Sequence, residues 1–287
     1  MFGIACLPSH AVAAAGRFTI SSGGSPRAAI LIQHNRLKKG RRPAIIVLRS
    51  ARKQGAHLHR SFSLEEMARS SGAVLVYPEP LSGHWADVSG PEANWDTHFV
   101  RDLIAKLVNQ GIANPSKVFL VGIGDGGIVA LRLACDGKQK FAGVAILASS
   151  LPSGLEASCA PPTPIPLLMI AGTSDPQVPY HDGRDRLPHD KSELLSVDKT
   201  LGVFGKAAGC AGGLTTTAFP DKDIRDGTRA YRDKLNNCAV PVEAVRIEAG
   251  GHTLPGVRDE AGAGVGLTNG DVNSAKLVWD FFRPFGG

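Results

Sequence analysis

The stretch SKVFLVGIGDGGIVALRLACD, from Ser116 to Asp136, contains the pattern that decides the fold. It begins with an apolar run that is typical of a buried strand, and it ends in a segment whose apolar residues have helical spacing. A glycine-rich turn joins the two. Short apolar strands that alternate with helices along the chain indicate an α/β protein, with a mainly parallel central sheet covered by helices on both faces.

Comparable elements are predicted on both sides of this unit. Residues 16–34 are typical of a hairpin, because two β-rich runs flank a turn of Ser, Gly and Pro. Further strands are expected at Pro43–Leu48, Ala73–Pro78, Gly143–Ala148, Pro166–Gly172 and, with alternating character, Val242–Ala249. Helices are expected at Ser61–Ser71, Asp96–Gln110, Lys191–Ala208 and Asp271–Phe282. The sequence contains no long linker and no repeat, which predicts a single domain over residues 17–287.

The amino-acid composition limits the classes of protein to which the chain can belong. Apolar residues make up 43% of the 287 residues, enough for a substantial core, and no apolar run is long enough to span a membrane. The net charge is +6, and the basic residues gather in Arg36–Arg42 and Arg49–Arg60. Neither run is interleaved with aromatic residues and no nucleic-acid motif is present. We therefore expect solvated loops rather than a nucleic-acid partner.

The N-terminus and the cysteines give information on whether the protein is exported to an oxidising compartment. Residues 1–16 are apolar and end in an A-x-A-like stretch, but Pro8 interrupts the run and no basic residue precedes it. A shortened signal peptide and a poorly folded N-terminus both remain open. None of the five cysteines forms a CxxC pair, which argues against zinc or thioredoxin-type sites. If Cys6 is removed with a leader, the remaining four fit two disulfides in an oxidising compartment, in any of three connectivities.

The glycine-rich turn has two interpretations. As a phosphate cradle it is a poor match, since GxGxGG is not GxGxxG and no Walker lysine follows, so no nucleotide cofactor is expected. As a nucleophile elbow, G-x-S-x-G, it matches at Gly122, Gly126 and Gly127, which would allow strand and helix to approach closely. Gly124 stands where the elbow carries its nucleophilic serine.

Two further loops complete the pattern. Asp175 follows the strand at Leu167–Ile170, and His252 lies in a glycine-rich loop after the last strand. Either residue alone would be an ordinary turn residue. In open parallel sheets, however, functional residues gather beyond the carboxyl ends of the strands. The order of elbow, Asp and His is also the chain order of α/β-hydrolase triads, so the pattern predicts the α/β-hydrolase fold.

From about Arg17 to Phe282 the chain resembles the secreted esterases grouped as polyhydroxybutyrate depolymerases, which are close to feruloyl and acetylxylan esterases. The motifs that carry the resemblance are KVFLVGIGDGGIVALRLAC, FAGVAILAS, PIPLLMIAGTSDPQVPYHDG, FGKAAGC and IEAGGHTLPG, in that order. The resemblance implies an extracellular or periplasmic carboxylic ester hydrolase without a cofactor or metal, acting on small or polymeric esters of the hydroxyalkanoate, feruloyl or acetyl type. It implies Asp175 as the triad acid and His252 as the general base.

The same resemblance implies two disulfides. They would pair Cys135 with Cys159 and Cys210 with Cys238.

The sequence also departs from the family pattern at two places. The nucleophilic serine falls on Gly124, and the His-Gly pair that helps to form the oxyanion hole falls on Arg49 and Ser50. Acyl transfer needs both an activated nucleophile and preorganised donors at the oxyanion. Loss of a serine nucleophile alone costs a factor of roughly 10⁶ in the turnover of a well-studied protease. We therefore expect an impaired hydrolase.

Several alternatives remain open at this stage. The chain could be a pseudo-hydrolase that binds a ligand or partner without turnover. It could use Asp125 as a displaced nucleophile, although an elbow centred there would put Ile123 where a small residue is required. A water molecule activated by His252 could attack the ester instead, but hydrolysis by this route would be slow. A serine at position 124 in a parent sequence would restore an ordinary esterase, but the changed Arg49 and Ser50 argue against an isolated swap.

Overall fold

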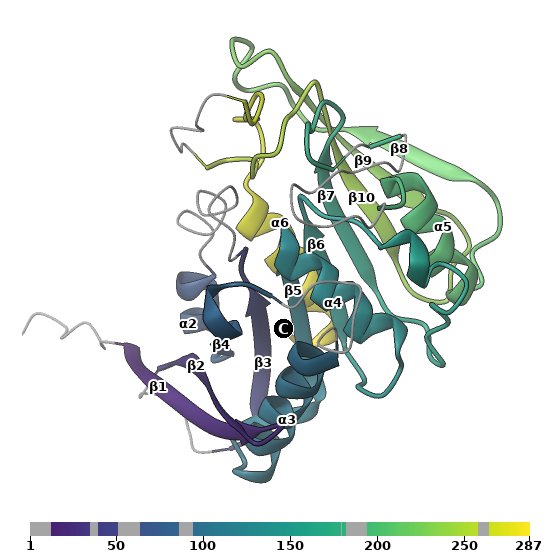
Figure 1. Cartoon of the computed structure of the whole chain (residues 1–287). Coiled ribbons are helices and arrows are strands. Elements are labelled where there is room, and N and C mark those ends of the chain that lie inside the picture. Colours follow the sequence, from purple (N-terminus) through teal and green to yellow (C-terminus); the bar gives the residue numbers. More distant parts are fainter. Residues whose placement is uncertain are drawn as a thin grey trace, which may run out of the picture.

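The computed structural model describes residues 13–34, 40–50, 64–85, 94–178, 180–181, 194–257 and 264–287. These residues form a ten-stranded sheet in the order β1-β2-β4-β3-β5-β6-β7-β10-β9-β8, shown in Figure 1. The strands are β1 (Ala13–Ser22), β2 (Ser25–His34), β3 (Arg42–Leu48), β4 (Val74–Pro78), β5 (Ala113–Ile123), β6 (Gly143–Leu147), β7 (Leu167–Gly172), β8 (Leu214–Ala218), β9 (Arg229–Leu235) and β10 (Val242–Glu248).

The centre of the sheet is parallel and its edges are antiparallel. Strands β4, β3, β5, β6, β7 and β10 pair in parallel. The β1–β2 hairpin lies antiparallel to β4 at one edge, and β9 and β8 extend the other edge in antiparallel pairing. The predicted mainly parallel α/β-hydrolase sheet is confirmed. Its parallel order brings the carboxyl ends of β3, β5, β7 and β10 to the same edge.

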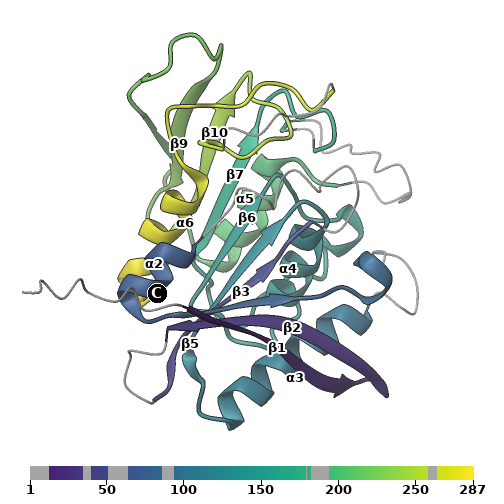
Figure 2. The same ribbon diagram turned by 90° about the vertical axis from the view of Figure 1, so that its left-hand side faces the viewer.

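Helices cover both faces, as the alternation of strands and helices predicts. The helical elements are α2 (Glu65–Ser71), η2 (Leu81–Gly83), α3 (Trp95–Asn109), α4 (Asp125–Cys135), η4 (Ser153–Leu155), α5 (Val197–Ala207), α6 (Ser274–Phe282) and η5 (Arg283–Phe285). One core packs α3, α4 and α5 against the sheet, and a second core packs α2 and α6 against the opposite face. Figure 2 shows the two layers on either side of the strands. Phe99, Leu103 and Leu107 form one stripe of α3 and are fully buried.

Some element boundaries and one burial pattern differ from the predictions. The helix expected from Lys191 begins at Val197, where the Ser196 side chain caps it by accepting a hydrogen bond from the backbone N–H of Lys199. The strand from Val242 does not alternate, because its first four residues are all buried. β10 lies between β7 and β9, with helices on its faces, so even Glu243 is enclosed.

The two edge regions were less readable from sequence. Strands β8 and β9 were missed, because β8 is the exposed run LTTTA and β9 is the charged run RAYRDKL. At the other end, β1 begins at Ala13, inside the segment 1–16 that the sequence suggests as a leader remnant. Residues 1–12, most of the two basic runs and the start of the helix predicted at Ser61 lie outside the described residues.

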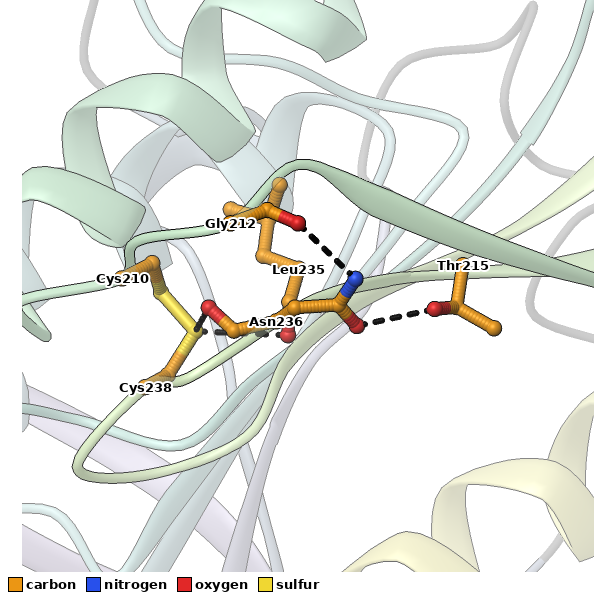
Figure 3. The surroundings of a disulfide bond; sticks show 6 residues. All are labelled: Cys210, Gly212, Thr215, Leu235, Asn236 and Cys238. Atoms are coloured by element: carbon orange, nitrogen blue, oxygen red, sulfur yellow. Dashed lines mark hydrogen bonds between the residues drawn. A yellow bond between two sulfur atoms is a disulfide. The ribbon is translucent and has the colours of Figure 1, made fainter.

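Both implied disulfides are present. Cys135, the last residue of α4, is bonded to Cys159, and Cys210 is bonded to Cys238. Figure 3 shows the second bond, which joins the segment after α5 to the segment after β9. Next to it Asn236 donates a side-chain hydrogen bond to Gly212 O and accepts one from Thr215, which closes the β8–β9 end.

Among the described residues, no helix combines the length and apolar character needed to cross a bilayer. The same residues contain no group of three or more His, Cys, Asp and Glu side chains arranged to hold a metal ion.

Candidate active site

The turn between β5 and α4 has the geometry of a nucleophile elbow. Gly124 is the residue at the turn, with φ of 56° and ψ of −127°. Residues with a side chain pay roughly 1–3 kcal/mol for such a conformation, whereas glycine adopts it readily. The backbone N–H of Gly124 donates to Leu147 O at 3.0 Å, and Gly124 O accepts from the N–H of Gly127 at 2.9 Å. These two bonds fix the turn between β6 and the start of α4.

Close approach explains the glycines that follow the turn. A Cβ added to Gly126 would lie 2.3 Å from Leu48 O, at the end of β3. A Cβ added to Gly127 would lie 2.4 Å from the Cβ of Ser149. The glycines at these positions therefore let α4 begin directly against the ends of β3 and β6, as an elbow requires.

An acid–base pair lies at the same edge of the sheet. His252 Nδ1 is 2.8 Å from Asp175 Oδ2, and both side chains are buried. Asp175 Oδ1 accepts hydrogen bonds from the backbone N–H of Gln177 at 2.7 Å and of Val178 at 2.8 Å. The carboxylate is thus held by its own turn. An Asp oxygen at Nδ1 orients the imidazole as in the Asp–His pair of a catalytic triad.

The loop that carries His252 is held by a neighbouring segment. The backbone N–H of His252 donates to Val265 O at 2.6 Å, and that of Gly251 donates to Leu267 O at 2.9 Å. This segment is held in turn by Asn269, whose side chain donates to Thr228 and to Asp271 at 2.9 Å each. A chain of hydrogen bonds therefore connects the His252 loop to the β8–β9 connection.

Asp271 is the charged residue in this series of hydrogen bonds. Its Oδ1 accepts backbone hydrogen bonds from Lys222 at 2.6 Å and from Asp223 at 3.0 Å. Burial acts to raise the pKa of Asp271, but these hydrogen bonds, the one from Asn269 and the charge of Arg229 outweigh it and lower the pKa below its ordinary value. Asp271 therefore stabilises this segment in its ionised form.

The loop after β3 has a different arrangement. Ser50 Oγ donates to Asp125 Oδ1 at 2.7 Å, and both residues are buried. Arg49 O accepts from Trp85 Nε1 at 2.8 Å, while the Arg49 guanidinium lies 4.6 Å from the centre of the Tyr77 ring. Burial, with the charge of Glu65, raises the pKa of Tyr77 to about 12 despite the opposing effect of Arg49, so the Arg49 cation faces a neutral ring.

All the site residues named from the sequence follow parallel strands at one edge of the sheet. Gly124 and Asp125 follow β5, Asp175 follows β7, His252 follows β10, and Arg49 and Ser50 follow β3. Only β6 lies between β5 and β7, so the ends of those two strands are about 10 Å apart. Direct hydrogen bonds connect His252 to Asp175 and Ser50 to Asp125.

Similarity to known proteins agrees with this geometry. Residues 93–194 match the model of the phospholipase/carboxylesterase family. The protein "Putative esterase NocK" of Nocardia uniformis subsp. tsuyamanensis is 30% identical over 256 residues, which cover 84% of this chain and 74% of that protein. The chain belongs to the esterase family of α/β hydrolases.

Other similar proteins are more distant in sequence. Feruloyl esterase D of Neurospora crassa is 24% identical over 227 residues, covering 78% of this chain and 66% of that protein. Feruloyl esterase B of Piromyces equi is 24% identical over 228 residues, which cover 76% of this chain and 37% of that longer protein. The structure of an acetyl xylan esterase from Aspergillus awamori superposes with a TM-score of 0.58 at 14% identity, covering 84% of this chain and 94% of that one. It shows a shared fold.

Sequence reasoning missed the contacts that hold the esterase-family loops in place. The bond between Ser50 and Asp125 joins residues 75 positions apart, and nothing local to either residue indicates it. The role of Asn269 and Asp271 had a weak signal, since the run TNGD has the composition of a turn whose side chains bond to the backbone. The hydrogen bond from Asn269 to Thr228 depends on the fold, because Thr228 lies in the connection between β8 and β9.

Proposed function

We propose that this esterase-family protein binds carboxylic esters and hydrolyses them at most very slowly. The observation that carries the proposal is the elbow itself. Gly124 occupies the turn with φ of 56° and offers no side chain, while Asp175 and His252 keep their hydrogen bond. The acid and the base of an acyl-transfer site are retained, and the group that they would activate is missing.

His252 has a defined task in such a site. With Nδ1 directed at Asp175, its Nε2 accepts a proton or a hydrogen bond from a group at the elbow. In an esterase with serine at the turn, that group is the attacking hydroxyl. Without it, the imidazole can only polarise a water or bind the polar part of a ligand. Attack by such a water lacks the covalent step and is expected to be slow.

The geometry gives little support to Asp125 as a replacement nucleophile. Asp125 is the first residue of α4, one position beyond the turn, and is 8% exposed. One of its carboxylate oxygens accepts the hydrogen bond from Ser50. A nucleophile needs an oxygen that reaches the substrate from the turn itself, and the residue in the turn conformation is Gly124.

The oxyanion side supports the same proposal. If Arg49 and Ser50 stand where active relatives carry His-Gly, then their contacts with Tyr77, Trp85 and Asp125 occupy the region where donors to an oxyanion would be needed. Two parts of the acyl-transfer machinery are altered together. This favours a protein that has lost turnover, and it supports a binding role as the second candidate function.

The ligand class follows from the family. Relatives are named as feruloyl esterases, and the motif resemblance adds esters of the hydroxyalkanoate type. We assign the site to small or polymeric carboxylic esters. The pairing of all four cysteines of the described residues in two disulfides supports secretion to an oxidising compartment. We also propose that residues 17–287 form a single α/β-hydrolase domain.

Hydrolysis of p-nitrophenyl acetate tests the proposal. The unmodified chain and Gly124→Ala should show negligible turnover, and Gly124→Ser should show measurable turnover that disappears in Gly124→Ser/His252→Ala. Adding Arg49→His and Ser50→Gly to Gly124→Ser should raise the rate further, because those changes restore the family pattern of the oxyanion loop. Efficient turnover by the unmodified chain that is lost in Asp125→Asn would overturn the proposal.

A further inference from the structure

A cavity of about 320 Å³ lies between the β1–β2 turn, η2 and the first turns of α3. The β1–β2 turn projects past the end of β4, because Ala29 of β2 already pairs with Pro78, the last residue of β4. Figure 2 shows this hairpin beside α3. The cavity therefore opens at the edge where the parallel strands end. β4 and β3 separate β2 from β5, which puts the two strands about 14 Å apart.

The wall of the cavity is unusually apolar for exposed surface. Trp95 is 51% exposed and Leu81 is 39% exposed, and both line it. Among the described residues, only five large hydrophobic side chains are exposed, and two of them meet in this one hollow. Exposed apolar groups gathered in a concave site indicate a ligand surface. An indole face offers a flat, rigid platform for a ring.

One face of α3 supplies both the platform and polar groups. Trp95, His98 and Asp102 lie at helical spacing i, i+3 and i+7, and all three are exposed. Asp102 Oδ2 accepts a hydrogen bond from Ser22 at 2.6 Å, which fixes the carboxylate at the cavity. The opposite face of the same helix is buried in the core. α3 therefore presents an aromatic plane with acceptors beside it.

The charges in the cavity disfavour an anionic ligand. Arg27 is the cationic residue of the lining, but its side chain is 4% exposed and lies 2.5 Å from Asp96. Its guanidinium also lies over the Phe99 ring at 4.0 Å. The positive charge is thus compensated below the surface, whereas Asp102 lines the cavity and is exposed. A ligand carboxylate or phosphate would meet that carboxylate, while neutral hydroxyl groups could donate to it.

We propose that this cavity binds a neutral sugar ring, as part of an oligosaccharide. The apolar C–H face of a pyranose stacks on Trp95 beside Leu81, and its hydroxyl groups donate to Asp102 and bond with His98. A purely aromatic ring would satisfy the indole but leave the polar side of the cavity without partners. The site is separate from Gly124 and does not depend on whether the chain hydrolyses esters.

Isothermal titration of the unmodified chain with cellotetraose and xylotetraose tests this site. At least one of the two should bind. Trp95→Ala should weaken that binding about tenfold or more, the loss of one aromatic stacking contact. Trp95→Phe should retain most of it, and Asp102→Asn should weaken it several-fold. Leu214→Ala, which removes another exposed hydrophobic on β8 at the far edge of the sheet, should leave binding unchanged.

Three results would overturn the proposal. They are no binding of either sugar by the folded chain, binding that Trp95→Ala leaves intact, and binding of benzyl alcohol but of neither sugar. Because Trp95 is half exposed, its variants should fold, and Trp95→Phe separates loss of the ring from loss of structure. Since binding is measured without hydrolysis, failure here is distinguishable from failure of the proposed esterase site.

Discussion

Ser50 Oγ donates a hydrogen bond to Asp125 Oδ1 at 2.7 Å, which ties the loop after β3 to the first residue of α4. This bond lies beside Gly124, the turn residue that has no nucleophilic side chain. The turn and the neighbouring loop are therefore joined directly through this hydrogen bond.

The bond between Ser50 and Asp125 should contribute measurably to stability. In Ser50→Ala a buried carboxylate oxygen loses its hydroxyl donor, which should lower the free energy of unfolding by about 1–3 kcal/mol. Urea unfolding followed by circular dichroism measures the change. Ser158→Ala is the matched control, because its hydroxyl donates to Leu155 O on the exposed surface. Equal stability of the two variants would show that the buried hydrogen bond contributes no more to the free energy of unfolding than the exposed one.

The packing at Gly126 should be intolerant of any side chain. Gly126→Ala would place a Cβ 2.3 Å from the backbone oxygen of Leu48, so β3 and α4 must move apart. We expect a loss of about 1–3 kcal/mol. Gly202→Ala is the control, since position 202 lies within α5 and no atom lies within 4 Å of its Cβ. That variant should gain up to about 1 kcal/mol, and a gain at position 126 as well would refute the close approach.

Much of this site could be predicted from the sequence because it rests on local patterns. The glycines of the elbow, the Asp after β7 and the His after β10 each lie beside a strand that is readable as an apolar run. The strands β8 and β9 escaped prediction because exposure and charge remove that pattern. The Ser50–Asp125 bond and the contact of Arg49 with Tyr77 escaped it because each depends on strands that become neighbours only in the folded sheet.

Asp271 should make stability depend on pH. Its pKa is lowered in the folded state, so its stabilising contribution is complete above the ordinary aspartate pKa of about 3.9 and is lost as the pH falls through its lower folded value. Asp271→Asn should therefore be less stable than the unmodified chain at pH 7, and the difference should shrink below about pH 4. Thermal unfolding across this range measures it.

The control for Asp271 is Asp280→Asn, which removes the carboxylate of a surface pair with Lys276. Surface pairs of this kind contribute about 0–1 kcal/mol. If the stability difference between Asp271→Asn and the unmodified chain stays constant from pH 7 to pH 3, the charge of Asp271 does not stabilise the fold.

The Cys135–Cys159 disulfide should stabilise the fold by restricting the unfolded chain. The bond closes a loop with a sequence separation of 24, for which chain entropy gives about 3 kcal/mol. Cys135→Ala/Cys159→Ala should unfold at correspondingly lower urea concentration. Intact mass after alkylation without reductant checks the bonds directly, because blocked thiols add no mass. Alkylation of these two cysteines in the native chain would contradict the pairing.

Covalent labelling with a fluorophosphonate tests most directly whether position 124 is the nucleophile position of a hydrolase elbow. The unmodified chain should gain no adduct mass. Gly124→Ser should gain one adduct that maps to position 124, and Gly124→Ser/His252→Ala should lose most of that reaction because the general base is gone. An adduct on the unmodified chain at Ser50 or another residue, or a folded Gly124→Ser variant that stays unlabelled, would contradict the account.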